Sequence, residues 1–207
     1  MLRWITRSCC VFALVLISSF VIAQAEFSAE IYDSQKAGKA GLTKLYFAKD
    51  KVRIEAQDSG RGQVAIIMNF ATQTATVLMA QQHMYMETPV QSQAQRAGYS
   101  FFRAGDVENA CEDWQKMTIH QTASCHRVGD ESVNGRSTVK YESTNSKGET
   151  GHFWLDSKLR FPVKWEEKNN NGELRNLQEG SQSASLFEVP AGYTKMDLGG
   201  MMQPQPH

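Results

Sequence analysis

Short segments in which apolar and polar residues alternate are the feature of this sequence that most constrains its fold. In one of them, Val52, Ile54 and Ala56 alternate with Arg53 and Glu55. This period of two is typical of a β-strand with one buried and one solvated face. A chain built from many such segments has to fold as a sheet that buries one of its faces.

Turn residues separate these segments along most of the chain. Lys49-Asp50 and Asn134-Gly135 are hairpin signals, and Pro89 is expected to end the first run of strands because proline cannot donate to a strand ladder. The pattern predicts a mainly β (α+β) fold, an antiparallel sheet of about ten or eleven strands that curves strongly into a half-barrel. The expected strands are 27–34, 42–48, 51–57, 64–70, 74–80, 83–87, 131–133, 137–143, 151–156, 161–168 and 173–178, with a further strand beginning near Cys125.

A helical insertion is expected between the two runs of strands. Residues 90–102 are poor in β-branched residues and rich in Gln and Ala, which favours a helix or a loop. Asn109 is expected to cap a short helix that ends at Met117, with Glu112 as the second member of a capping box. Residues 184–187 are expected to form one helical turn. We expect the insertion to act as a short helical lid over the concave side of the sheet.

The N-terminus has the order of a secretory signal. Arg3 and Arg7 precede an apolar run of 14 residues, and Ala23-Gln24-Ala25 supplies the small residues of a cleavage site. We expect a signal peptide over residues 1–25 that is cleaved after Ala25, export to the periplasm, and one domain over 26–198. The alternative is an uncleaved membrane anchor, although the run is shorter than the roughly 20 residues of a membrane-spanning helix.

Charge and composition restrict the partners and the tail. Without Arg3 and Arg7 the chain has 20 basic and 22 acidic side chains, a formal charge of −2, which argues against a nucleic-acid binder. Residues 199–207 contain only Gly, Met, Gln, Pro and His, and we expect a disordered tail there.

Two cysteines remain after the predicted cleavage. In an exported protein Cys111 and Cys125 are expected to form a disulfide that closes a loop of about 15 residues. The alternative is a zinc site that includes the nearby His120 and His126, but this spacing fits no standard zinc motif. We therefore expect a disulfide and no metal.

Methionines cluster in three consecutive predicted strands, which suggests a ligand-binding surface. Methionine is flexible and polarizable and adapts to varied apolar ligands, although ordinary core packing is the alternative for each one. If the concave side is partly open, apolar residues of these strands would line it and aromatic residues of the insertion would close over them. The candidates are Val64, Ile66, Met68, Phe70, Met79, Met84, Met86, Tyr99, Phe101 and Phe102.

Catalytic and cofactor motifs are not found in the sequence. It contains no Gly-x-Ser-x-Gly nucleophile elbow, no His-Glu-x-x-His zinc helix and no phosphate-binding Gly-x-x-x-x-Gly-Lys-Ser/Thr loop. The histidines show no metal-ligand spacing. We therefore expect no catalytic residues, no cofactor and no enzymatic activity.

Three parts of the chain carry a family resemblance. They are Phe27–Glu30 with Leu45–Glu55, Gln82–Glu87, and Trp154–Asp156 with Phe161–Glu166 and Leu186–Tyr193. With these motifs the chain resembles the periplasmic outer-membrane lipoprotein carrier superfamily (LolA-like fold), and most closely its uncharacterised bacterial members. The resemblance covers nearly all of the chain after the signal. It implies an unclosed half-barrel with a helical lid over an apolar cavity, in which characterised relatives carry the acyl chains of lipoproteins or lipids.

The sequence thus predicts an exported, non-enzymatic binding or carrier protein for a lipid, an acyl chain or another apolar small molecule, with transient membrane contact. The alternative is a structural or protein-interaction module of the cell envelope, with a filled core and an exposed edge strand that binds an envelope protein.

Overall fold

The computed structural model describes residues 25–33, 43–58, 60, 62–92, 102–117, 122–145 and 147–196. Residues 1–24 of the predicted signal peptide 1–25, the predicted tail 199–207 and the candidates Tyr99 and Phe101 lie outside these residues. Helical structure within them comprises Val90–Ser92, the helix α2 (Cys111–Met117) and the 3₁₀ turn η1 (Ala184–Phe187).

All strands of the described residues belong to one sheet, which confirms the predicted mainly β fold. The order across the sheet is β12-β6-β5-β4-β3-β2-β1-β11-β10-β9-β8-β7, and every pairing except β12 with β6 is antiparallel. The twelve strands are β1 (Phe27–Asp33), β2 (Thr43–Ala48), β3 (Lys51–Asp58), β4 (Gly62–Asn69), β5 (Thr74–Met79), β6 (Met84–Pro89), β7 (Thr122–Val133), β8 (Arg136–Asn145), β9 (Thr150–Asp156), β10 (Pro162–Glu167), β11 (Asn170–Glu179) and β12 (Thr194–Lys195).

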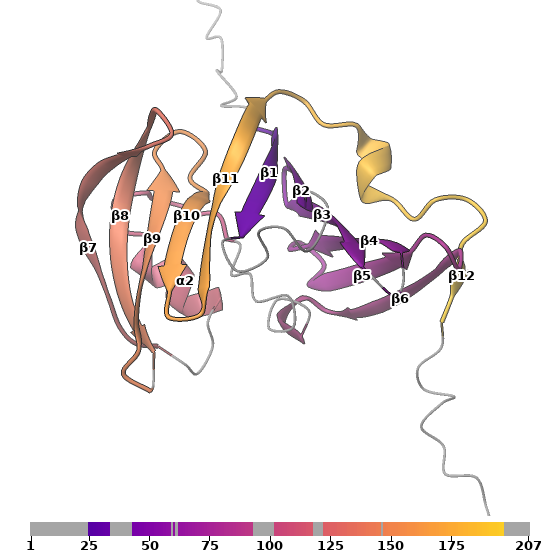
Figure 1. Cartoon of the computed structure of the whole chain (residues 1–207), viewed down its shortest axis with the longest axis horizontal. Helices are drawn as coiled ribbons and strands as arrows, with labels where there is room; N and C mark the ends of the chain where they lie inside the picture. Colours follow the sequence, from indigo (N-terminus) through magenta and orange to yellow (C-terminus); the bar gives the residue numbers. More distant parts are fainter. Residues whose placement is uncertain are drawn as a thin grey trace, which may run out of the picture.

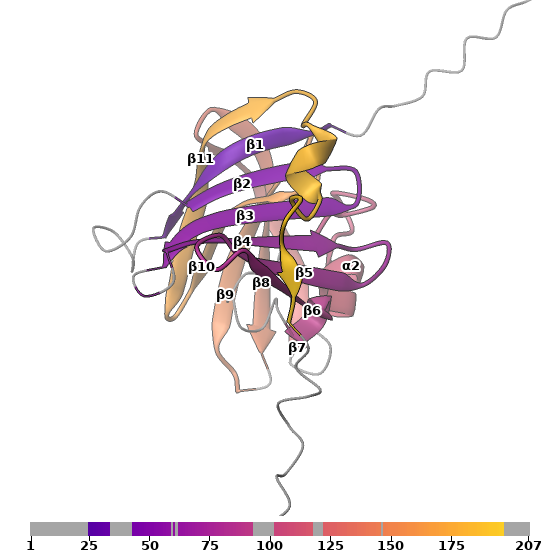
Figure 2. The ribbon, with the colours of Figure 1, turned by 90° about the vertical axis from the view of Figure 1, so that its right-hand side faces the viewer.

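The first strand lies in the middle of this sheet and joins two meanders. β1 pairs with β2 on one side and with β11 on the other, so β2–β6 and β7–β11 form its two wings. The sheet bends so strongly that the two wings lie at a steep angle to each other and enclose a concave side (Figure 1). Viewed from the side, β1–β6 cross in front of β7–β10, with α2 behind the front wing and η1 and β12 on its outer surface (Figure 2). The sheet is therefore an unclosed half-barrel.

The turns have the backbone geometry that their residues predict. Lys49 has a φ of 52°, and Asn134 and Gly135 have φ values of 51° and 78°. Positive φ at both central residues matches a two-residue hairpin to the twist of its strands. The predicted hairpins at these positions are confirmed, and β6 ends at Pro89 as expected.

The concave side carries the main core. Phe27, Phe47 and Phe161 are fully buried there, with ring centroids 5.1 to 5.4 Å apart. Two smaller clusters complete the interior: one lies beneath the insertion, on β8 and β9, and the other lies on the outer surface of β2–β6, where Phe187 of η1 packs against Ile67 and Leu78.

Two local predictions were wrong, and one short strand was not predicted. Gly172 lies inside β11, opposite Trp165 of β10, rather than in the turn. A Cβ at this position would come within 2.4 Å of Trp165 Cζ2, so the strand has room only for glycine there. β12 was not expected, since a strand of two residues cannot show alternation. Asn109 is not the cap of the helix, because α2 begins at Cys111 and Ala110 directly precedes it; the Nδ2 of Asn109 donates to Asp106 (2.6 Å).

Candidate ligand-binding site

The register of β4, β5 and β6 brings the predicted apolar lining together on one face. Directly opposed residues of an antiparallel pair point to the same side. Val64 is opposite Met79, which is in turn opposite Met84, and Met86 is opposite Val77 in the next row. Met68, which is opposite Ala75 in another row of the same face, belongs to the core of the concave side.

Burial falls along this face toward β6. Met68 is only 2% exposed, whereas Val64 and Ile66 are half-buried. All three methionines of β5 and β6, Met79, Met84 and Met86, are also half-buried. The face therefore has a sealed part near β1 to β3 and an accessible apolar part on β4 to β6.

The other predicted lining residues lie elsewhere. Phe70 follows β4 and packs against the edge of the main core. Phe102 is 4% exposed and belongs to the cluster on β8 and β9, where its ring meets Phe153 edge-on at a centroid distance of 5.8 Å. Phe102 is thus brought together with the base of the insertion and not with the methionines. The structure gives the positions of Phe70 and Phe102, and their role in ligand binding stays a prediction.

The insertion is fixed to β7, β8 and β9 around α2. Trp114 of α2 stacks on Phe153 with centroids 5.8 Å apart. Cys111, the first residue of α2, forms a disulfide with Cys125 of β7, and the Cα atoms are 5.6 Å apart. The disulfide that the sequence predicts is confirmed, and it holds the start of the helix on the wing formed by β7–β11.

Arg103 is a functional candidate that the alternation of apolar and polar residues in the sequence did not identify. Its guanidinium carbon lies 5.4 Å from the centre of the Phe47 ring, on the concave side, and Nη1 is buried without a hydrogen-bond partner. Burial lowers the pKa of Arg103, the nearby Arg160 lowers it further, and Asp50 opposes both effects. Arg103 lies in a segment without strand or helix periodicity, so no sequence pattern predicted its burial.

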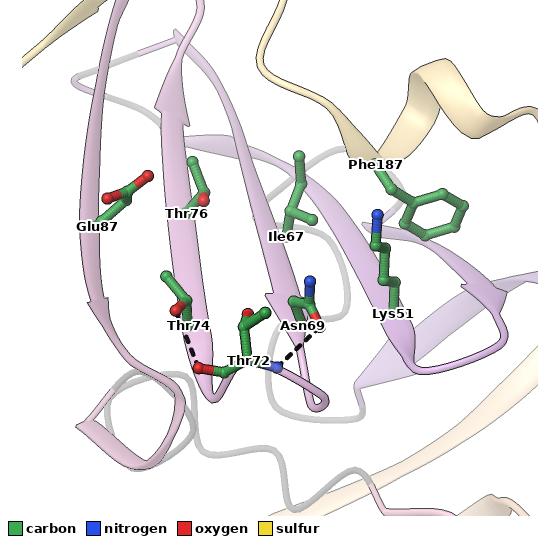
Figure 3. A pocket seen from close by; sticks show the side chains of 8 residues that line it. All are labelled: Lys51, Ile67, Asn69, Thr72, Thr74, Thr76, Glu87 and Phe187. Carbon is green, nitrogen blue, oxygen red and sulfur yellow. Dashed lines mark hydrogen bonds between the residues drawn. The ribbon is translucent and has the colours of Figure 1, made fainter.

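A hollow lies on the outer surface of the sheet, on the opposite side from the predicted lining. Its volume is about 310 Å³, and Figure 3 shows that its walls are mostly polar. Thr72 N donates to Asn69 Oδ1 (3.2 Å), and the hydroxyl of Thr74 donates to the carbonyl of Thr72 (3.2 Å). Glu87 is already paired with Lys195. The lining residues are Lys51, Ile67, Asn69, Thr72, Thr74, Thr76, Glu87 and Phe187.

The described residues contain neither a metal site nor a membrane-spanning helix. No group of three or more His, Cys, Asp or Glu side chains there is arranged to hold a metal ion. Among the same residues, none of the helices has the length and apolar character needed to cross a membrane.

The fold is an unclosed half-barrel made of one curved, mainly antiparallel sheet. The chain belongs to the family described as "Domain of unknown function (DUF4412)", whose model matches residues 29–160. The structure is similar to that of an uncharacterised conserved protein from Thermus thermophilus, with a TM-score of 0.53 and 9% identity over 84% of this chain and 90% of that chain. The predicted resemblance to uncharacterised members of the carrier superfamily is confirmed.

Two more distant solved structures belong to the same comparison. A LolA superfamily protein from Nitrosomonas europaea has a TM-score of 0.34 and 9% identity, over 81% of this chain and 91% of that chain. MucB, solved in the Pseudomonas aeruginosa MucA/MucB complex, has a TM-score of 0.47 and 11% identity, over 82% of this chain and 57% of that chain. This chain thus spans little more than half of MucB. No curated protein matches the sequence. These likenesses concern the fold alone.

Proposed function

We propose that this protein is a non-enzymatic periplasmic binding or carrier protein for a lipid, an acyl chain or another apolar ligand. The observation that carries the proposal is the accessible apolar face on β4–β6. Met79, Met84 and Met86 share that face and are half-buried rather than sealed in the core. An apolar ligand that covered them would remove the remaining apolar surface from water.

The surroundings of this face favour a ligand on the concave side. The outer surface of the same strands is already covered by η1, where Leu186 and Phe187 pack, and by Tyr193 just before β12. At about 4.8 Å per strand, the face from β3 to β6 is roughly 14 Å wide. Such a width accommodates a flexible apolar chain, and methionine side chains adjust to chains of different shape.

Export is part of the proposal. The order of positive, apolar and small residues before Glu26 is that of a cleaved signal peptide. The Cys111–Cys125 disulfide is stable in an oxidising compartment such as the periplasm. A soluble protein there would meet its ligand at, or after extraction from, a membrane surface.

The test is native mass spectrometry of protein purified from the periplasm, followed by titration of the stripped protein with cis-parinaric acid. We expect an adduct of lipid mass and saturable binding of the fluorescent fatty acid. Met86→Glu places a charge on the apolar face and should weaken binding at least about tenfold. Val128→Glu is the matched control, because Val128 is 50% exposed on β7, away from this face. A protein that shows only its own mass and no saturable binding contradicts the proposal.

A second candidate function rests on β7. Within the described part of the chain this strand pairs only with β8, so one side of its 12 residues is an open edge (Figure 1). An open edge can accept a strand from another protein. The protein would then be an interaction module of the envelope. Pull-down from envelope extracts with the unaltered protein and with Val128→Pro tests this function, because proline at a free edge blocks strand addition.

A further inference from the structure

Buried side-chain polar atoms without a partner are rare in the described part of this protein, and both of them face the concave side. They are Nη1 of Arg103 and Oγ1 of Thr88. Thr88 is opposite Ala75 in β5, which places it on the same face as Met86. A buried donor that lacks an acceptor destabilises the folded protein, and it does so more strongly when the group is charged. Such a group is retained where something else supplies the missing partner.

Arg103 differs in this respect from the other arginines that the structure describes. Arg53, Arg127, Arg136 and Arg175 each donate to a carboxylate, and Arg160 donates to the carbonyl of Gly105. The guanidinium of Arg103 instead lies against the ring of Phe47, with Nη1 unsatisfied. Its charge is thus held at an apolar surface without a carboxylate bound to that nitrogen.

The charges around Arg103 do not compensate it. Arg160 repels the guanidinium, and Asp50 is the acidic group that attracts it. Desolvation is a larger effect than either of these and lowers the pKa of Arg103. An anion next to Nη1 would accept the hydrogen bond that Nη1 lacks. Its negative charge would also balance the charge of the guanidinium. Arginine suits carboxylates and phosphates because its planar fork donates to two oxygens at once.

We propose that Arg103 anchors the anionic head group, a carboxylate or a phosphate, of an amphiphile whose apolar chain lies on the concave face. The proposal rests on the function proposed above and specifies its ligand class. Phe47, beside Arg103, shares a row across the sheet with Val52, Met68, Ala75 and Thr88, and the methionines lie at the far end of this face. From β2 to β6 this distance is about 19 Å at the usual strand spacing. The guanidinium of Arg103 thus lies at the buried end of the face, next to β2, and the apolar surface extends from there to β6.

The experiment compares ligands that share one chain and differ in charge. Stripped protein is titrated at pH 8 with cis-parinaric acid and with its uncharged methyl ester, and an acyl glycerol phosphate competes in a third arm to separate phosphate from carboxylate. We expect the unaltered protein to bind the acid about 10- to 100-fold more tightly than the ester. Arg103→Gln should remove this preference by weakening the acid while leaving the ester unchanged. Arg103→Lys should keep part of it.

Two control variants separate this role from general effects of charge and polarity. Arg175→Gln removes a charge at the half-exposed Arg175 of β11, and Thr88→Val removes the other unsatisfied group; both should keep the preference. Equal binding of acid and ester by the unaltered protein overturns the inference and leaves the proposed function standing. Binding of neither probe overturns the proposed function itself. The comparison of the two probes on the unaltered protein needs no variant, so a poorly folded Arg103→Gln does not prevent the test.

Discussion

Tyr141 and Phe153 stack with their ring centroids 5.1 Å apart and their planes 9° from parallel. The Tyr141 hydroxyl donates to the carbonyl of Val107 (2.6 Å) and accepts from the Ala110 N–H (3.3 Å). One side chain of the sheet thus holds the backbone just before α2.

The first prediction follows from this contact. Tyr141→Phe keeps the stack on Phe153 but leaves a carbonyl and an N–H of the insertion unsatisfied. We expect the free energy of unfolding to fall by about 1–3 kcal/mol, measured by urea denaturation. Hydrogen exchange should show faster exchange at Ala110. An unchanged unfolding free energy together with unchanged exchange would contradict this role.

The second prediction concerns the disulfide. Replacing Cys111 and Cys125 together by serine removes a cross-link between residues 14 positions apart. The chain-entropy model gives a loss of about 3 kcal/mol for a loop of this size. The unaltered protein should lose the same amount when it is unfolded with a reductant present. The serine variant is the control for that measurement, since the reductant should leave its stability unaffected.

The third prediction tests the glycine inside β11. A Cβ at Gly172 would lie 2.4 Å from Trp165 Cζ2 and 2.7 Å from the backbone oxygen of Tyr32. Gly172→Ala should therefore destabilise the protein by about 1–3 kcal/mol through overpacking, as measured by thermal unfolding. Gly129→Ala makes the same change in β7, where a Cβ would meet nothing within 4 Å. Comparable losses from the two variants would show that this crowding is unimportant.

The fourth prediction is a pH dependence. The Trp154 indole N–H donates to Glu131 (2.7 Å) and lowers the pKa of that carboxyl, and Lys140 lowers it further. A carboxyl whose pKa falls on folding stabilises the protein above its ordinary value of 4.5, and this contribution disappears as the pH falls through the lowered value. Glu131→Gln should therefore be less stable than the unaltered protein at pH 7, and the difference should shrink on acidification. Denaturation midpoints between neutral and acidic pH check this, and parallel curves would refute it.

The fifth prediction concerns the stability cost of Arg103. Because its guanidinium is partly desolvated and Nη1 is buried and unpaired, Arg103→Met should leave the stability of the ligand-free protein unchanged or raise it. Differential scanning calorimetry of the stripped protein measures this. A large fall in melting temperature would mean that Arg103 is needed for folding, through its contact with Phe47.

Several features could be predicted because their signals are local. The alternation around Val52 and Val64 is enough to place the concave face, and Asn134-Gly135 specifies its hairpin. The disulfide follows from cysteine number and compartment. The position of Gly172 could not be predicted in this way, because it depends on where Trp165 packs.

Features that depend on distant parts of the chain gave no signal in the sequence. The pairing of β1 with β11 joins segments from opposite ends of the chain, and alternation does not specify a partner. The buried position of Arg103 is set by the approach of its segment to Phe47 and Arg160, which has no periodic signature. Of the predicted lining, the residues on β4–β6 were brought together, while Phe102 was placed with β8 and β9.

The central position of β1 has a kinetic consequence. Its Phe27 is opposite Phe47 in β2, but its other edge pairs with β11, where Phe27 is opposite Glu179. A chain that is synthesised N-terminus first can form the β1–β6 wing early, but the other edge of β1 is covered only after nearly all of the chain has been made. Pairings between such distant segments make folding slow. During this interval the exposed edge of β1 is the point at which the unfinished protein is most open to misassembly and to binding by a chaperone.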